Sequence, residues 1–165
     1  MQVLKRSRKP PREGDIFVYQ VKSHPFGFGR VIRLNTKIGG FERVILLYLY
    51  DAFSPTKEPV PKLDRRKLLV PPLGTNQRPW TMGYFETICH RPLEAEDVLP
   101  VHCFWDDMYE PVRYFDEFGR RLKKRSEPCN VDALGSFRTI DVEISLALGI
   151  EPAPDTIPGP GSGLG

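Results

Sequence analysis

Apolar and polar residues alternate over much of the first half of the chain, and this two-residue period predicts β-strands. Three segments show the pattern: residues 15–22, 28–34 and 42–50. The third segment is almost continuously apolar, so we expect it to be the central strand, buried on both faces. Turn-forming residues separate the segments, among them the run from Ser23 to Gly27. The first half therefore predicts an antiparallel sheet.

The second half is less regular. Residues 51–80 are rich in proline, which predicts a long loop around a short strand at 67–70. Further strands are predicted at 84–90 and 98–105. Residues 113–116 and 120–123 bracket a short turn that contains a glycine, which is typical of a β-hairpin.

One helix is predicted near the C-terminus. Ile140, Ile144 and the pair Ala147–Leu148 recur at helical spacing, Thr139 or Asp141 is expected to cap the start, and Gly149 suits the position after the end. The predicted class is mostly β (α+β): a single curled antiparallel sheet or a small barrel-like domain, with the C-terminal helix closing one side.

Charge divides the chain of 165 residues. Its net charge is +3, but five basic residues and no acidic one lie within residues 1–12. We therefore predict a basic flexible tail at 1–11, one β-rich domain at 12–150, and a disordered tail at 151–165, which holds four prolines and four glycines. The nearly neutral domain lacks the basic face of a nucleic-acid binder, so no specific nucleic-acid partner is expected.

Compartment and assembly follow from what the sequence lacks. The longest apolar run, residues 44–50, is far shorter than a membrane span of about 20 residues, and no secretion signal is visible. Cys89, Cys103 and Cys129 are odd in number and form no CxxC motif, which favours free thiols in a reducing compartment. We expect Cys89 and Cys103 to be buried in strands and Cys129 to be exposed in a loop. The protein is predicted to be a cytoplasmic monomer.

Two short motifs carry a family resemblance. Gly14-Asp15-Ile16-Phe17, followed by Gly27-Phe28-Gly29-Arg30-Val31, resembles the opening of the immunity protein 26 family, most specifically over residues 12–50. The resemblance implies two functions. Most members are regarded as immunity proteins that bind and neutralise a bacterial toxin, and one branch is associated with phosphotriesterase activity. The sequence-based interpretation places a phosphotriesterase, a hydrolase of neutral organophosphate-type aryl esters, narrowly first, with the toxin-binding protein as the alternative.

Hydrolysis of a neutral ester needs an activated water or a side-chain nucleophile, together with an apolar pocket for the substrate. The candidate catalytic residues are His90, His102, Cys103 and Asp106, and the candidate pocket residues are Trp80, Tyr84 and Trp105. The spacing of the histidines and aspartates matches no standard metal site, so the sequence leaves a divalent metal cofactor open. Structural roles for these residues, as loop hydrogen-bonding groups and core aromatics, remain the alternative.

A toxin-binding role would use other residues. Asp106, Asp107, Glu110, Asp116 and Glu117 form an acidic stretch opposed only by Arg113. Tyr109 and Tyr114 within it are side chains of the type that anchors protein interfaces. The partner would then be a basic protein toxin instead of a small ester substrate. The alternative for this stretch is a solvated loop.

Overall fold

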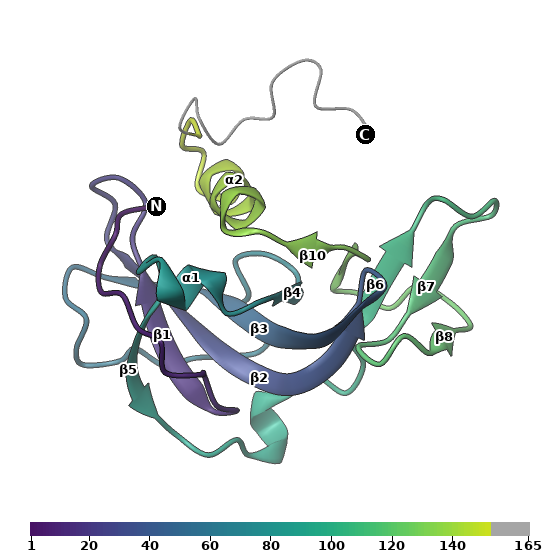
Figure 1. Cartoon of the computed structure of the whole chain (residues 1–165), viewed down its shortest axis with the longest axis horizontal. Helices are drawn as coiled ribbons and strands as arrows, with labels where there is room; N and C mark the ends of the chain where they lie inside the picture. The colour runs from purple at the N-terminus through teal and green to yellow at the C-terminus, as the bar shows by residue number, and fades with distance from the viewer. Residues whose placement is uncertain (153–165) are drawn as a thin grey trace.

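The computed structural model describes residues 1–152, and Figure 1 shows the arrangement of their elements. The predicted disordered tail at 151–165 lies almost entirely outside the described residues. The strands are β1 (Asp15–Tyr19), β2 (Phe26–Ile38), β3 (Phe41–Ser54), β4 (Leu73–Thr75), β5 (Glu86–His90), β6 (Cys103–Asp106), β7 (Arg113–Phe115), β8 (Arg121–Leu122), β9 (Cys129–Val131) and β10 (Leu134–Gly135). The helices are α1 (Arg78–Thr81), a short 3-10 turn (Ala95–Asp97) and α2 (Phe137–Ala147).

The strands form two open sheets. The first has the order β10-β4-β3-β2-β1-β5, and the second has the order β8-β7-β6-β9. Both sheets are mixed, because β10 runs parallel to β4 and β9 runs parallel to β6. The mostly β class and the C-terminal helix are confirmed. The predicted single antiparallel sheet is replaced by two sheets. The long strands β2 and β3 extend away from β1 and β5, and the second sheet lies at their opposite end (Figure 1).

β3 is the central strand and is buried on both faces, as its apolar pattern predicts. Ile45, Leu47 and Leu49 join one core cluster, which also contains Ile140 and Ile144 of α2. The alternate residues of the strand join a second cluster, Leu46, Tyr48 and Tyr50, which includes Phe104 of the second sheet. Successive side chains of a strand point to opposite faces, so β3 supports both layers at once.

The glycines of the two motifs lie where a side chain would overlap neighbouring atoms. A Cβ atom at Gly29 would overlap the ring of Phe17, and one at Gly27 would overlap the ring of Tyr19. Gly14 has a φ of +93°, which favours glycine, and a Cβ there would overlap the Arg91 carbonyl. Gly27 and Gly29 of β2 therefore leave room for the Tyr19 and Phe17 rings of β1, and Gly14 leaves room for the Arg91 carbonyl.

Several sequence predictions need correction. The predicted strand at 67–70 is reduced to a bridge between Tyr50 and Leu68, because two prolines follow at once, and the paired strand β4 begins only after them. The strand predicted at 98–105 begins at Cys103, beyond Pro100. Ser136, and neither Thr139 nor Asp141, caps α2 by accepting the Thr139 N–H, whereas Gly149 follows the helix with a φ of +67° as predicted.

The basic N-terminal segment is docked instead of free. The Leu4 N–H donates to the Gly83 carbonyl and the Ser7 N–H donates to the Trp80 carbonyl. The Met1 amino nitrogen lies 2.9 Å from Asp141 of α2. Charge composition alone favours a solvated arm. Backbone hydrogen bonds to α1 and to the turn that follows it hold the segment against the domain instead. No helix among the described residues is long and apolar enough to cross a membrane.

Candidate functional site

The predicted catalytic residues lie on two different sheets. His90 ends β5, an edge strand of the six-stranded sheet, whereas His102, Cys103 and Asp106 lie at or next to β6 in the second sheet. Cys103 and His90 therefore do not lie on neighbouring strands. The structure brings these four residues into no common site.

His102 is buried in a network that connects the two sheets. Its Nε2 atom lies 2.6 Å from the Tyr48 hydroxyl, and its Nδ1 atom lies 3.0 Å from a Glu117 carboxylate oxygen. The Tyr48 hydroxyl also accepts the Leu99 N–H at 3.0 Å. These distances fit a neutral imidazole that accepts the tyrosine proton at Nε2 and donates its own Nδ1 proton to the carboxylate. The side chain of His102 is 2% exposed, so it is out of reach of a substrate.

The network perturbs the two acids at its ends. Burial raises the pKa of the Tyr48 hydroxyl to about 12, which keeps it a donor. Burial is the largest single influence on Glu117 and opposes its ionisation, but the hydrogen bond from His102, a backbone hydrogen bond and the positive charge of Arg33 together hold the pKa of this carboxyl below its ordinary value. Glu117 is therefore the charged end of a buried chain of hydrogen bonds that runs through His102 to Tyr48.

The remaining candidates beside β6 have structural contacts. The Asp106 carboxylate accepts the Met108 N–H at 2.9 Å and so holds the turn after the strand. Cys103 faces Cys129 on the neighbouring strand β9. Cys129 is 4% exposed, which corrects the prediction that it lies exposed in a loop.

The predicted apolar pocket residues also separate. Trp80 is 1% exposed and packs against Phe17 in the core. Tyr84 stacks on Phe137 of α2, with ring centroids 5.1 Å apart. Trp105 lies on β6, opposite Tyr114 of β7. These aromatic residues stabilise three different parts of the fold and do not share one pocket.

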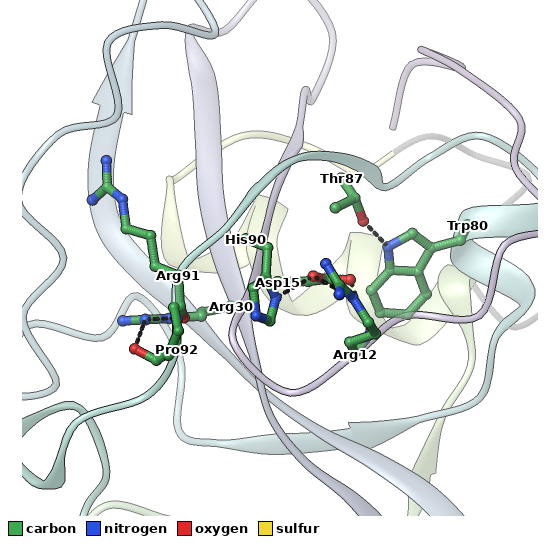
Figure 2. A network of polar contacts seen from close by, with 8 residues as sticks. All are labelled: Arg12, Asp15, Arg30, Trp80, Thr87, His90, Arg91 and Pro92. Carbon is green, nitrogen blue, oxygen red and sulfur yellow. Dashed lines mark hydrogen bonds and ion pairs between the residues drawn. The ribbon is translucent and has the colours of Figure 1, made fainter.

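His90 has a different partner, which the sequence did not indicate. Its Nδ1 atom lies 2.8 Å from a carboxylate oxygen of Asp15, which is only 4% exposed (Figure 2). The second oxygen of Asp15 accepts the Arg12 N–H at 2.9 Å. The imidazole is thereby oriented, in the manner of a histidine held by a carboxylate. The two residues lie 75 positions apart, so only the pairing of β1 with β5 joins them.

An open cleft of about 350 Å³ adjoins this pair. It is lined on one side by the N-terminal segment and on the other by β5; the lining includes Lys5, Ser7, Lys9, Arg12, Cys89 and His90. The cleft has an oriented imidazole, but within residues 1–152 no nucleophilic side chain forms a hydrogen bond with it. No group of histidine, cysteine and carboxylate side chains among residues 1–152 is arranged to hold a metal ion.

The family-motif arginine is also structural. The Arg30 guanidinium donates to the Arg91 carbonyl at 2.7 Å and to the Pro92 carbonyl at 3.3 Å (Figure 2), and it pairs with Asp97. It therefore fixes the segment that follows β5 against β2. Arg30 and Asp15 are both buried, and the hydrogen bonds and ion pairs that each forms explain why charged residues stand at these two motif positions.

The most exposed apolar side chains of the second sheet lie at the connection between β6 and β7. We call residues 106–112 the docking tip. Met108 is 91% exposed, and Tyr109 and Val112 are each 39% exposed. The Arg113 guanidinium stacks over the Tyr109 ring at 4.0 Å, which holds that ring in place. Exposed apolar residues grouped in this way are typical of protein-interaction sites.

The docking tip is also acidic. Asp107 and Glu110 are exposed, and neither forms an ion pair within residues 1–152. Asp132, at the end of β9, has a raised pKa, chiefly through burial and further through the charge of Asp106. The tip thus combines an apolar centre with carboxylates that lack a cationic partner. The acidic stretch predicted from sequence is divided by the fold, because Glu117 is committed to His102.

These features belong to a β-rich protein with an exposed, apolar and acidic tip between β6 and β7 and no assembled catalytic centre among the described residues. The immunity protein 26 family model matches residues 12–111, well over half of the chain, and the protein belongs to this family. The match begins at Arg12, just before β1, and ends at Pro111, so it covers all of the docking tip except Val112. No curated protein and no solved structure matches the chain.

Proposed function

We propose that the protein is an immunity protein that neutralises a bacterial toxin by binding it through the docking tip. Family membership supports the class of function, and the exposed apolar centre of the tip is the observation that supports its location. Met108 and Tyr109 are of the residue types enriched in interface cores, where a few aromatic side chains supply most of the binding free energy.

The charge of the tip favours a basic partner surface. The carboxylates of Asp107 and Glu110 flank the apolar residues at a rim where solvent screens them. Such rim charges mainly accelerate association and make it sensitive to salt, whereas the buried anchor limits dissociation. We therefore assign the affinity of the complex mainly to Tyr109 and the rate of association mainly to the acidic residues.

The test takes as its candidate partner a secreted toxin whose gene is found adjacent to the gene for this protein. We expect co-expression to rescue growth, and the purified proteins to form a complex measurable by titration calorimetry. Tyr109→Ala should weaken binding at least about tenfold, which is the usual loss for an interface anchor. The double variant Asp107→Lys, Glu110→Lys should slow association and reduce its salt dependence.

A matched control is available on the other sheet. Asp51 of β3 is exposed and lies outside the docking tip, so Asp51→Lys should leave association unchanged. Wild-type affinity in both the Tyr109→Ala variant and the charge-reversal variant would exclude the docking tip. Failure of the wild-type protein to bind or protect would exclude this toxin as the partner.

Phosphotriester hydrolysis is tested separately with a chromogenic aryl phosphotriester. His90 is the one histidine of the predicted set with an oriented ring beside an open cleft, whereas His102 is buried. An immunity protein acting only by binding should give no turnover above background. Turnover that falls about 100-fold or more in His90→Ala, and not in a folded His102→Ala variant, would establish hydrolysis at the cleft instead.

A further inference from the structure

The second sheet contains two cysteines in register on adjacent parallel strands. Cys103 opens β6 and Cys129 opens β9, and the two residues are direct partners in the ladder. Their Sγ atoms lie 2.6 Å apart, closer than ordinary packing of two sulfur atoms. Both residues are buried, with 1% and 4% exposure. The thiols are unbonded in the structure.

The backbone geometry suits a covalent link. Neighbouring strands lie about 4.7–4.9 Å apart, which falls within the range of about 4.4–6.8 Å found between the Cα atoms of disulfides. The in-register pairing places both Cβ atoms on the same side of the sheet. Forming the bond therefore requires no change of strand register.

We propose that Cys103 and Cys129 are a reversible disulfide site that takes a small-molecule disulfide as its oxidant. One thiolate attacks the oxidant and releases one thiol, and the second thiolate then displaces the remaining half as another thiol. In total, two S–H bonds of the protein become one S–S bond, and the S–S bond of the oxidant becomes two thiols. A reducing thiol pool reverses the exchange.

Access to the site is controlled by β9. Burial, followed by contact with Cys103, raises the pKa of the Cys129 thiol to about 12, so the closed pair reacts slowly. β9 is a three-residue strand at the edge of its sheet, and short edge strands open more readily than central ones. The exchange is expected to proceed through local opening of this strand.

The link would close a ring around the part of the protein that we assign to partner binding. The chain between the two cysteines includes the docking tip, β7 and β8. A disulfide at the base of this segment would constrain it at both ends. The site itself stands on the cysteine geometry, so its test does not depend on the proposed function.

The experiment incubates the full chain in mixtures of oxidised and reduced glutathione, blocks the remaining thiols, and maps the peptides by mass spectrometry. We expect one intramolecular link between Cys103 and Cys129, with Cys89 left as a thiol or as a mixed disulfide with glutathione. Reductant should then restore both thiols. Cys89 is the internal control, because it is half-buried on β5 in the other sheet.

Variants and stability complete the test. Cys89→Ser should retain the link, whereas Cys103→Ser should lose it. Oxidation should raise the Tm of the Cys89→Ser protein by roughly 5–10 °C, the effect expected for closing a ring of this size. Peptides that carry only glutathione after complete oxidation, or a link that involves Cys89, would overturn the proposal. A linked protein with an unchanged Tm would overturn the inference that the bond constrains the sheet.

Discussion

Replacing Tyr48 with phenylalanine removes one hydroxyl group from the junction of the two sheets and leaves the aromatic ring in place. The hydroxyl accepts the Leu99 N–H at 3.0 Å and lies 2.6 Å from His102 Nε2. Its removal leaves a backbone donor and an imidazole acceptor without partners in a buried place. Each group left unsatisfied costs about 1–3 kcal/mol. Small shifts of the surrounding atoms should relieve part of this cost. We therefore expect the free energy of unfolding to fall by roughly 2–4 kcal/mol.

The assay is denaturant unfolding at neutral pH, with the m value checked for an unchanged denatured state. Tyr19→Phe is a matched control, because Tyr19 is equally buried but its hydroxyl has no hydrogen-bond partner within the described chain. Its removal should be neutral or stabilising. If Tyr48→Phe costs no more than Tyr19→Phe, the network does not stabilise the junction of the sheets.

The same network predicts a dependence on pH. The folded state lowers the pKa of Glu117 below its ordinary value of 4.5, so ionisation of this group stabilises the fold above that pH. The contribution is lost as the pH falls through the lowered pKa of the folded state. Glu117→Gln should therefore be less stable than the wild type at neutral pH, and the difference should shrink in acid. A difference that stays constant from neutral to acidic pH would contradict this role.

Three further outcomes are expected for stability. Leu47→Ala should cost roughly 2–5 kcal/mol in denaturant unfolding, because Leu47 is fully buried in β3, whereas Leu146→Ala on the exposed face of α2 should cost less than about 0.5 kcal/mol. Gly29→Ala should cost about 1–3 kcal/mol, since the new methyl group overlaps the Phe17 ring; a neutral effect would show that the ring can move aside. Deleting residues 1–8 should lower the Tm measured by calorimetry, and an unchanged Tm would mean that the segment contributes no stability.

The local sequence pattern determined the strands of the first half and the last helix. Alternation of apolar residues predicted β1, β2 and β3, and the continuous apolar run of β3 predicted its burial on both faces. Helical spacing and Gly149 predicted the end of α2. These features depend on residues close together in the chain, where periodicity and turn chemistry act directly.

Only the tertiary structure decided which side chains meet. His90 meets Asp15 through strand pairing, and His102 meets Glu117 through the turn between β7 and β8. Cys103 meets Cys129 only because β9 returns parallel to β6, a crossover that no local pattern predicts. The docking of the N-terminal segment likewise depends on backbone hydrogen bonds to distant residues. Sequence patterns report the face on which a side chain lies, whereas its partner depends on the order and register in which distant strands pair.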